Sequence, residues 1–250
     1  AASDVYKRQE YYFVDKTLMI KDLLDKRSKV SLFTRPRRFG KTLNMSMIQR
    51  FFEKTGESNA YLFEGLNISK TGQKYMQHQG RYPVISVSLK SMKQATYELA
   101  YETYKYIIKD EFRRHRAFIY HANVLDQEEQ RRYDAFLDIN ASDSVYYKAI
   151  GFLSVCLERA YHKNVIILID EYDVPLENSY FCGFYDKMIG LIRSVFESAL
   201  KTNPALEFAV LTGCLRISKE SIFTGLNNLK VYSVTNNLSL IHISEPTRRS

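Results

Sequence analysis

The feature that most constrains this chain is a run of five apolar residues, 165–169, followed directly by Asp170 and Glu171. The run reads Val-Ile-Ile-Leu-Ile, so it has the length of a strand without any alternation of apolar and polar residues. Strands of this kind are buried on both faces, as in parallel sheets covered by helices on either side. The sequence therefore predicts a parallel sheet with two carboxylates at the end of one inner strand.

Other segments fit the same architecture. Strand patterns occur at residues 30–34, 83–89, 206–211 and 231–234, and helical spacing occurs at 17–25, 42–52, 93–114, 126–136, 143–161 and 184–201. Strands separated by long helical segments indicate an α/β fold, a three-layer sandwich with a mostly parallel sheet. We expect a helical insertion at about residues 93–162, and Asp143 as the cap of the helix at 143–161 within it.

The loop after Val30–Thr34 has the character of a phosphate-binding loop. Its last residues, Gly40-Lys41-Thr42, match the end of the pattern GxxxxGK[ST], whereas Arg35 stands where the pattern has its first glycine. Backbone N–H groups and the following helix N-terminus favour a phosphate. Lys41 would neutralise the β- and γ-phosphates, and the Thr42 hydroxyl would bind Mg²⁺. The nucleotide-binding residues we expect are Arg37, Arg38, Phe39, Gly40, Lys41 and Thr42.

The acidic end of the 165–169 strand supplies the second half of such a site. Ligands of open parallel sheets bind beyond the carboxyl ends of the strands. Asp170 would hold Mg²⁺, and Glu171 would polarise an attacking water. The two halves together predict a P-loop NTPase, with Lys41 and Glu171 as catalytic residues.

Enzymes with a glutamate at this place insert a further strand between the lysine strand and the acidic strand. Residues 206–211 are our candidate for that strand. Thr212, at its tip, would then lie between the loop and Glu171 and act in catalysis by sensing the γ-phosphate. A plain turn threonine is the alternative. Arg193 is a weak candidate for an arginine finger.

These residues resemble the predicted AAA-ATPase-like family of bacterial proteins. The resemblance covers essentially residues 10–237, and the family also lacks the first loop glycine, so Arg35 is no departure from it. It rests on the segments 12–17 (Tyr-Phe-Val-Asp-Lys-Thr), 35–42, 169–173, 211–213 and 218–228. It implies an ATPase core, with Lys41 and Thr42 on phosphate and Mg²⁺, and Asp170 and Glu171 on metal and water. Many members resemble proteins that continue into a restriction-nuclease-like C-terminal domain.

The two ends of the chain look like translated sequencing adapter. Residues 1–9 and 238–250 are encoded by DNA strings that resemble one transposon end and its reverse complement, and such scars are left out of fold reasoning. Each end carries one net positive charge, so the formal net charge of +8 falls to +6 for residues 10–237. We expect the natural protein to be longer, with any nuclease-like domain missing from this fragment.

Composition limits the partners and the compartment. The three cysteines are widely spaced, which favours a reduced, cytoplasmic setting, and no apolar run approaches the roughly 18 residues that span a bilayer. The expected ligands are ATP and Mg²⁺, in an ATP-hydrolysing module of a larger bacterial protein, with a homo-oligomer as a further option. The alternatives are a nucleotide switch with little hydrolysis, and a nucleic-acid-binding module that uses the basic loop. The tyrosines of 93–114 recur at helical spacing, which favours a core over a base-stacking platform.

Overall fold

The computed structural model describes residues 14–36, 38–139, 141–214, 222–223 and 229–232. Its centre is a five-stranded sheet in the order β2-β3-β4-β1-β5, and every neighbouring pair is parallel. The strands are β1 (Val30–Thr34), β2 (Val84–Ser88), β3 (Val165–Asp170), β4 (Leu206–Gly213) and β5 (Leu229–Tyr232). The α/β prediction is confirmed, and so is the position of residues 206–211 between the lysine strand β1 and the acidic strand β3.

The apolar run of β3 divides its side chains between two hydrophobic clusters. Val165, Ile167 and Ile169 pack in the larger cluster, whereas Ile166 and Leu168 pack in the smaller one. All six residues of β3 are buried, because successive side chains point to opposite faces and each face carries helices. The absence of alternation in the sequence is thus explained by two covered faces.

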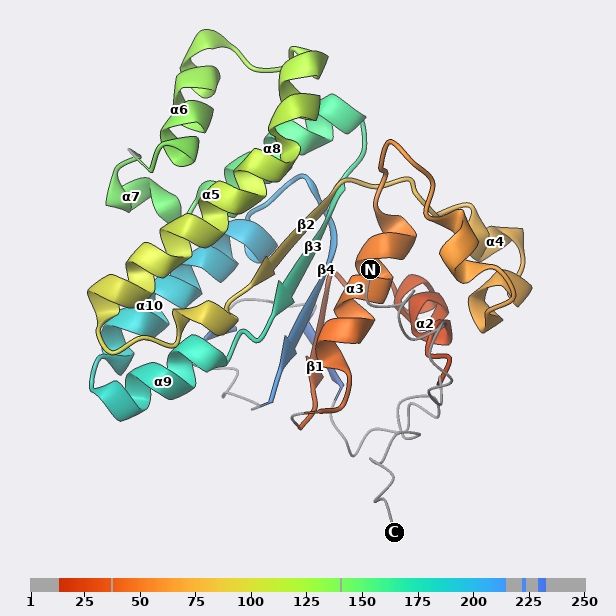
Figure 1. Cartoon of the computed structure of the whole chain (residues 1–250), viewed down its shortest axis with the longest axis horizontal. Coiled ribbons are helices and arrows are strands. Elements are labelled where there is room, and N and C mark those ends of the chain that lie inside the picture. Colours follow the sequence, from red (N-terminus) through yellow and green to blue (C-terminus); the bar gives the residue numbers. More distant parts are fainter. Residues whose placement is uncertain (1–13, 37, 140, 215–221, 224–228, 233–250) are drawn as a thin grey trace.

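The smaller cluster lies under the N-terminal helices. It is covered by α2 (Leu18–Lys26) and α3 (Lys41–Phe52), together with the short turns η1 (Ala60–Phe63), η2 (Asn67–Lys70) and α4 (Gln73–Met76). Figure 1 shows α3 along the sheet, with α2 and α4 beyond it, and all the strand arrows point toward one end of the molecule.

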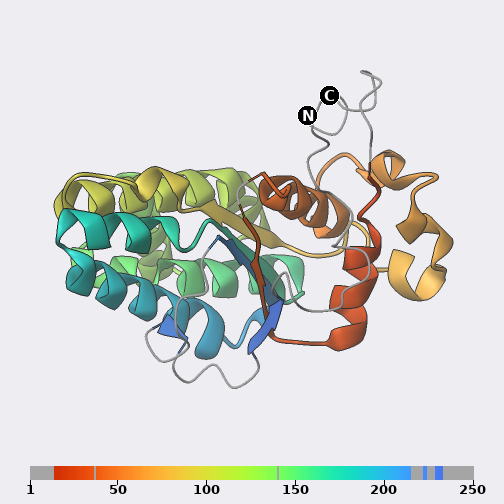
Figure 2. The same ribbon diagram turned by 90° about the horizontal axis from the view of Figure 1, so that it is seen from below.

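The other face carries the longer helices. They are α5 (Tyr97–Ala122), α6 (Gln127–Leu137), α7 (Asp143–Tyr146), α8 (Ala149–Tyr161), α9 (Val174–Cys182) and α10 (Tyr185–Phe196), the last followed by the π-helical turn η4 (Glu197–Lys201). Helix α5 packs on β2 and α8 packs on β3. Figure 2 separates the two helical layers, with the sheet between them. None of the helices in the described part of the chain is long and apolar enough to cross a membrane.

Several predicted boundaries differ from the structure. Residues 143–161 form two helices, and Ser142 rather than Asp143 is the N-cap of the first, so the Asp143 cap is wrong. Helix α5 begins at Tyr97 behind its cap Thr96 and runs eight residues past the predicted end. Helix α9 was not predicted, since residues 174–182 show almost no amphipathic pattern. The tyrosine prediction holds for three residues, since Tyr104 is 1% exposed and Tyr97 and Tyr101 pack on the same core, but Tyr106 is 50% exposed.

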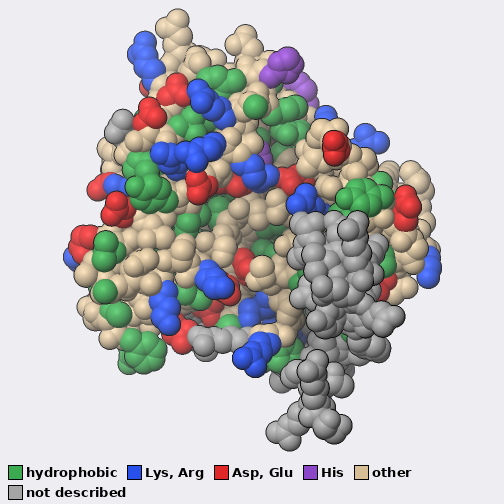
Figure 3. Space-filling view, in the orientation of Figure 1, with side chains coloured by type: hydrophobic (Ala, Val, Ile, Leu, Met, Phe, Trp, Pro, Cys, Tyr) green, Lys and Arg blue, Asp and Glu red, His purple; other side chains and the backbone are tan. Residues whose placement is uncertain are grey.

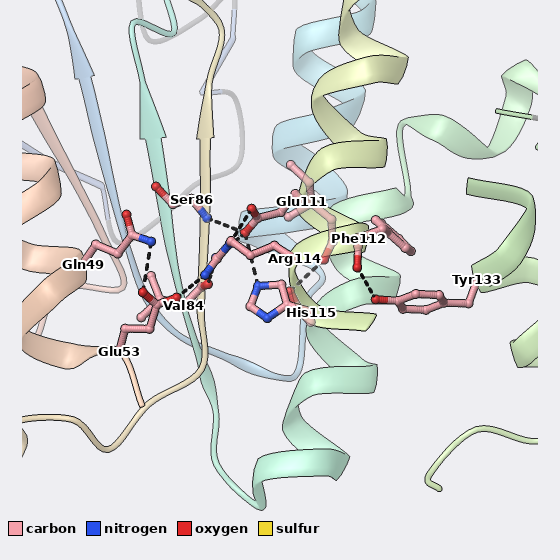
Figure 4. Close-up of polar contacts among 11 residues, drawn as sticks. Gln49, Glu53, Val84, Ser86, Glu111, Phe112, Arg114, His115 and Tyr133 are labelled. Carbon is pink, nitrogen blue, oxygen red and sulfur yellow. Dashed lines mark hydrogen bonds and ion pairs between the residues drawn. The ribbon is translucent and has the colours of Figure 1, made fainter. Parts of the chain in front are cut away.

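A group of charged residues joins α5 to the outer strand β2; we call Glu53, Glu111, Arg114 and His115 the edge cluster. Glu53, Glu111 and His115 are buried, whereas the Arg114 side chain is 34% exposed. Arg114 pairs with Glu53, at the end of α3, and with Glu111, whose Oε1 lies 2.6 Å from its Nη2. Arg114 Nη2 also donates to the Val84 carbonyl at 2.5 Å, and the Ser86 N–H donates to Glu111 Oε1 at 2.8 Å. His115 lies 3.3 Å from Glu111 Oε1 (Figure 4). Each charge of the edge cluster is therefore paired.

Candidate functional site

The site lies where β1, β3 and β4 end. Phe33 of β1 is level with Thr212 of β4, and Ile169 of β3 is level with Leu211. The three carboxyl ends therefore meet at one edge of the sheet, which is where ligands of parallel sheets bind. The strands of Figure 1 point toward the lower part of the molecule. Figure 3, in the same orientation, shows several Lys and Arg side chains in that lower part.

The loop between β1 and α3 turns sharply at its end. Gly40 is the N-cap of α3 with φ +71°, a conformation that favours glycine, and Arg38 also has a positive φ of 70°. The first helical hydrogen bond runs from the Asn44 N–H to the Gly40 carbonyl, at 2.9 Å. The first turn of α3 holds no acidic residue. Its positive end is thus directed at the loop, as an anion site requires.

The Lys41 ammonium folds back over the loop. Its Nζ donates to the carbonyls of Arg35 at 2.8 Å and Pro36 at 2.9 Å, and lies 3.1 Å from Cys214 Sγ. These contacts are between the ammonium and neutral groups, so an anion can replace them with a stronger, charge-assisted interaction. Cys214, directly after β4, is a neighbour of the site that the sequence analysis did not assign.

Thr42, Asp170 and Thr212 form a continuous chain of hydrogen bonds. The Thr42 hydroxyl donates to Asp170 Oδ2 at 2.8 Å, and the Thr212 hydroxyl donates to Asp170 Oδ1. Asp170 is 7% exposed and Thr212 is 2% exposed. The two halves that the sequence predicted as a unit, 128 residues apart, are therefore in direct contact.

The tips of β3 and β4 are held together tightly. Glu171 has φ +55°, and its N–H points at the Thr212 hydroxyl at 3.5 Å. The Cys214 N–H donates to Asp173 Oδ2 at 2.7 Å. At Gly213, a Cβ would lie 2.6 Å from the Tyr172 ring, so only glycine fits this position. This packing fixes the peptide that carries Glu171.

Two further cations lie beside the loop, and neither was among the predicted site residues. Arg35 is 5% exposed, and burial lowers the pKa of its guanidinium. Lys16, just before α2, is half-buried; burial and the charge of Arg35 both lower the pKa of its ammonium. A small cavity of about 20 Å³ is lined by Arg35, Phe39, Lys41 and Thr212 among others. In the sequence, Lys16 stood out only because it lies in the segment 12–17, one of those that carry the family resemblance.

The remaining predicted site residues fall into two groups. Phe39 lines the small cavity and Arg38 is exposed on the loop. Arg37 lies outside the described residues. Arg193 is exposed on α10. The roles of all the predicted residues stay predictions.

Comparison with known proteins gives a family and one distant relative. A family model described as "Predicted AAA-ATPase" matches residues 4–223. The protein described as "Uncharacterized protein in vnfD 5'region" of Azotobacter chroococcum mcd 1 is 27% identical over 233 residues. That alignment covers 93% of this chain and 39% of the relative, so the chain spans about two fifths of the relative's length. No solved structure matches the chain.

Proposed function

Because the chain belongs to the predicted AAA-ATPase family, we propose that it binds ATP with Mg²⁺ at the β1–β3–β4 edge and hydrolyses it. The observation that carries the proposal is the hydrogen bond between Thr42 and Asp170. Thr42 is at the start of a helix, and its hydroxyl lies 2.8 Å from the buried Asp170 carboxylate. Mg²⁺ accepts such hydroxyl and carboxylate oxygens as ligands beside phosphate oxygens.

Each residue then has a defined task. Thr42 and Asp170 would hold Mg²⁺, which when bound neutralises charge developing on the phosphates. Lys41 leaves the Arg35 and Pro36 carbonyls for the phosphate oxygens. Glu171 accepts hydrogen bonds from the attacking water and orients it toward the terminal phosphate. Thr212 holds one oxygen of Asp170, so that the other oxygen keeps its direction.

The test compares three proteins in two assays. Wild type should bind ATP in a Mg²⁺-dependent titration, whereas Lys41→Ala should bind at least tenfold more weakly because it loses the phosphate cation. Glu171→Gln should still bind ATP but release phosphate at least a hundredfold more slowly, within the usual range for a general base. Arg50→Met, a change at an exposed position at the far end of α3, is the control and should match wild type in both assays.

Two results would redirect the proposal. ATP binding with no phosphate release by wild type would favour the nucleotide switch over the hydrolase. DNA binding with a steep salt dependence that survives Lys41→Ala, without ATP binding, would favour the nucleic-acid module.

A further inference from the structure

The Arg35 side chain is a buried cation with unmet hydrogen-bonding groups. Its Nε and Nη2 are buried atoms with no hydrogen-bond partner, and it forms no ion pair within the part of the chain that the structure describes. Burying a polar group without a partner costs free energy, and more so for a charged group. A buried guanidinium with unpaired N–H groups is suited to bind a ligand that accepts hydrogen bonds.

The backbone of Arg35 is already engaged. Its N–H donates to the Gly213 carbonyl at 3.0 Å, and its carbonyl accepts the Lys41 ammonium at 2.8 Å. In the general loop pattern the first glycine lets backbone groups come close to the phosphates. Here only the side chain of the equivalent residue can serve a ligand.

Lys16 is brought to the same loop by its two neighbours in sequence. Asp15 accepts the Thr17 N–H at 2.8 Å and the Asn67 N–H at 2.6 Å, and the Thr17 hydroxyl accepts the Ile68 N–H at 3.0 Å. These bonds fasten the start of α2 to η2. The Lys16 ammonium then lies 3.9 Å from where a Cβ on Gly40 would be. Asp15 and Thr17 therefore have a positional task, and Lys16 is held beside the loop.

Cationic side chains gather around this point. Lys16 and Arg35 are close enough for the charge of Arg35 to act on Lys16, and Lys41 lines the same small cavity as Arg35. Of the carboxylates at or after the end of β3, Asp170 has its two oxygens bonded to Thr42 and Thr212, and Asp173 accepts the Cys214 N–H. Three cations gathered round one glycine turn repel one another, and an anion with several charges relieves that repulsion.

We propose that Arg35 and Lys16 bind the polyphosphate of the nucleotide together with Lys41, as side-chain ligands that replace the backbone contacts of the first loop glycine. The inference rests on the proposed function and adds two ligands to it. It also explains why an arginine occupies a loop position that glycine holds elsewhere: the side chain supplies the donors that the backbone cannot.

The experiment measures ligand affinity and ligand-free stability on the same proteins. The ligands are ATP, sodium tripolyphosphate and adenosine, and the variants of the full chain are Arg35→Met, Arg35→Lys and Lys16→Met, with Arg50→Met as the control. Arg35→Met should weaken ATP and tripolyphosphate binding at least tenfold, which corresponds to about 1.4 kcal/mol, and Arg35→Lys should lose less. Adenosine binding, where present, should not change.

The ligand-free melting temperature separates a ligand from a structural residue. Arg35→Met should melt at the wild-type temperature or above it, because the guanidinium has no partner to lose at Nε and Nη2. A large drop in melting temperature together with unchanged ATP affinity in Arg35→Lys and Lys16→Met would overturn the inference. So would affinities within twofold of wild type in all three variants, and this result would leave the proposed function intact. If neither ATP nor tripolyphosphate binds wild type, both proposals fall together.

Discussion

Charged side chains cluster in two places in the molecule, and the two clusters are built differently. In the edge cluster, Arg114 contacts two carboxylates and a strand carbonyl, so that every charge has a partner inside the fold. In the loop cluster, which we define as Lys16, Arg35 and Lys41, all three charges have the same sign. The charges of the edge cluster pair with one another, whereas we propose that the charges of the loop cluster pair with a ligand. On that proposal, paired opposite charges mark a structural group, and like charges mark a binding group.

The largest effect is expected from breaking the edge cluster. Arg114→Met leaves Glu53 and Glu111 buried without their cation, and should lower the free energy of unfolding by about 3–5 kcal/mol. Urea denaturation measures this. The neighbouring Arg113 is exposed and pairs with Asp110 only at 3.4 Å, so Arg113→Met should stay within about 0.5 kcal/mol of wild type. Equal stability of the two variants would show that the edge cluster is dispensable.

Acid should weaken the same cluster more gradually. Burial alone would raise the pKa of Glu111, but hydrogen bonds from His115 and Arg114 outweigh it and lower the pKa from 4.5 to about 2. A lowered folded pKa adds stability above pH 4.5, and this stability is lost as the pH falls toward 2. The loss should be about 3 kcal/mol. Urea titrations across this range should give a flatter profile for Glu111→Gln than for wild type, and parallel profiles would contradict the assignment.

A smaller effect is expected at the Thr212 hydroxyl, which joins β4 to the acidic strand β3. Thr212→Val removes a donor from the buried Asp170 and should lower the free energy of unfolding by about 1–2 kcal/mol. Thr212→Ser keeps the hydroxyl and should recover most of this loss. Failure of serine to do so would point to packing of the Thr212 methyl group as the cause.

The smallest effect should come from the loop cluster. Without ligand, Arg35→Met should leave the free energy of unfolding unchanged or raise it by up to about 1 kcal/mol, since desolvation of the guanidinium is no longer required. Denaturation in ligand-free, low-salt buffer measures this. A loss as large as that of Arg114→Met would make the two clusters equivalent and remove the contrast between them.

Much of the fold was predictable because it depends on local pattern. The uninterrupted apolar run of β3 requires two covered faces, and a strand–loop–helix around Gly40 requires a turn with positive φ. The order β3-β4-β1 followed from the acidic pair after β3 together with a second apolar strand downstream. The contact between Thr42 and Asp170 is consistent with this order, because α3 begins just after the end of β1, Asp170 ends β3, and the two strands end at the same edge on either side of β4.

The parts that were missed depend on contacts between distant segments. Lys16 precedes Arg35 by 19 positions, and its sequence neighbourhood does not show that it lies beside the loop until α2 is placed there. Glu111 and Arg114 have the i,i+3 spacing of a surface ion pair on a helix. Nothing in that spacing shows that β2 lies beneath them. The break in residues 143–161 was missed because apolar residues continue through it.

The way α5 meets β2 also governs how the sheet can grow. An outer strand normally has unpaired N–H and C=O groups along its free edge, and another chain can pair with them, which leads to strand addition and aggregation. In β2 the outward N–H of Ser86 and carbonyl of Val84 are taken by Glu111 and Arg114. A foreign strand that paired here would have to displace two charged side chains from their partners. The β2 edge of the sheet is therefore closed to β-augmentation. Arg114→Met should open this edge to pairing with other chains, and so promote aggregation, as well as lower the stability of the fold.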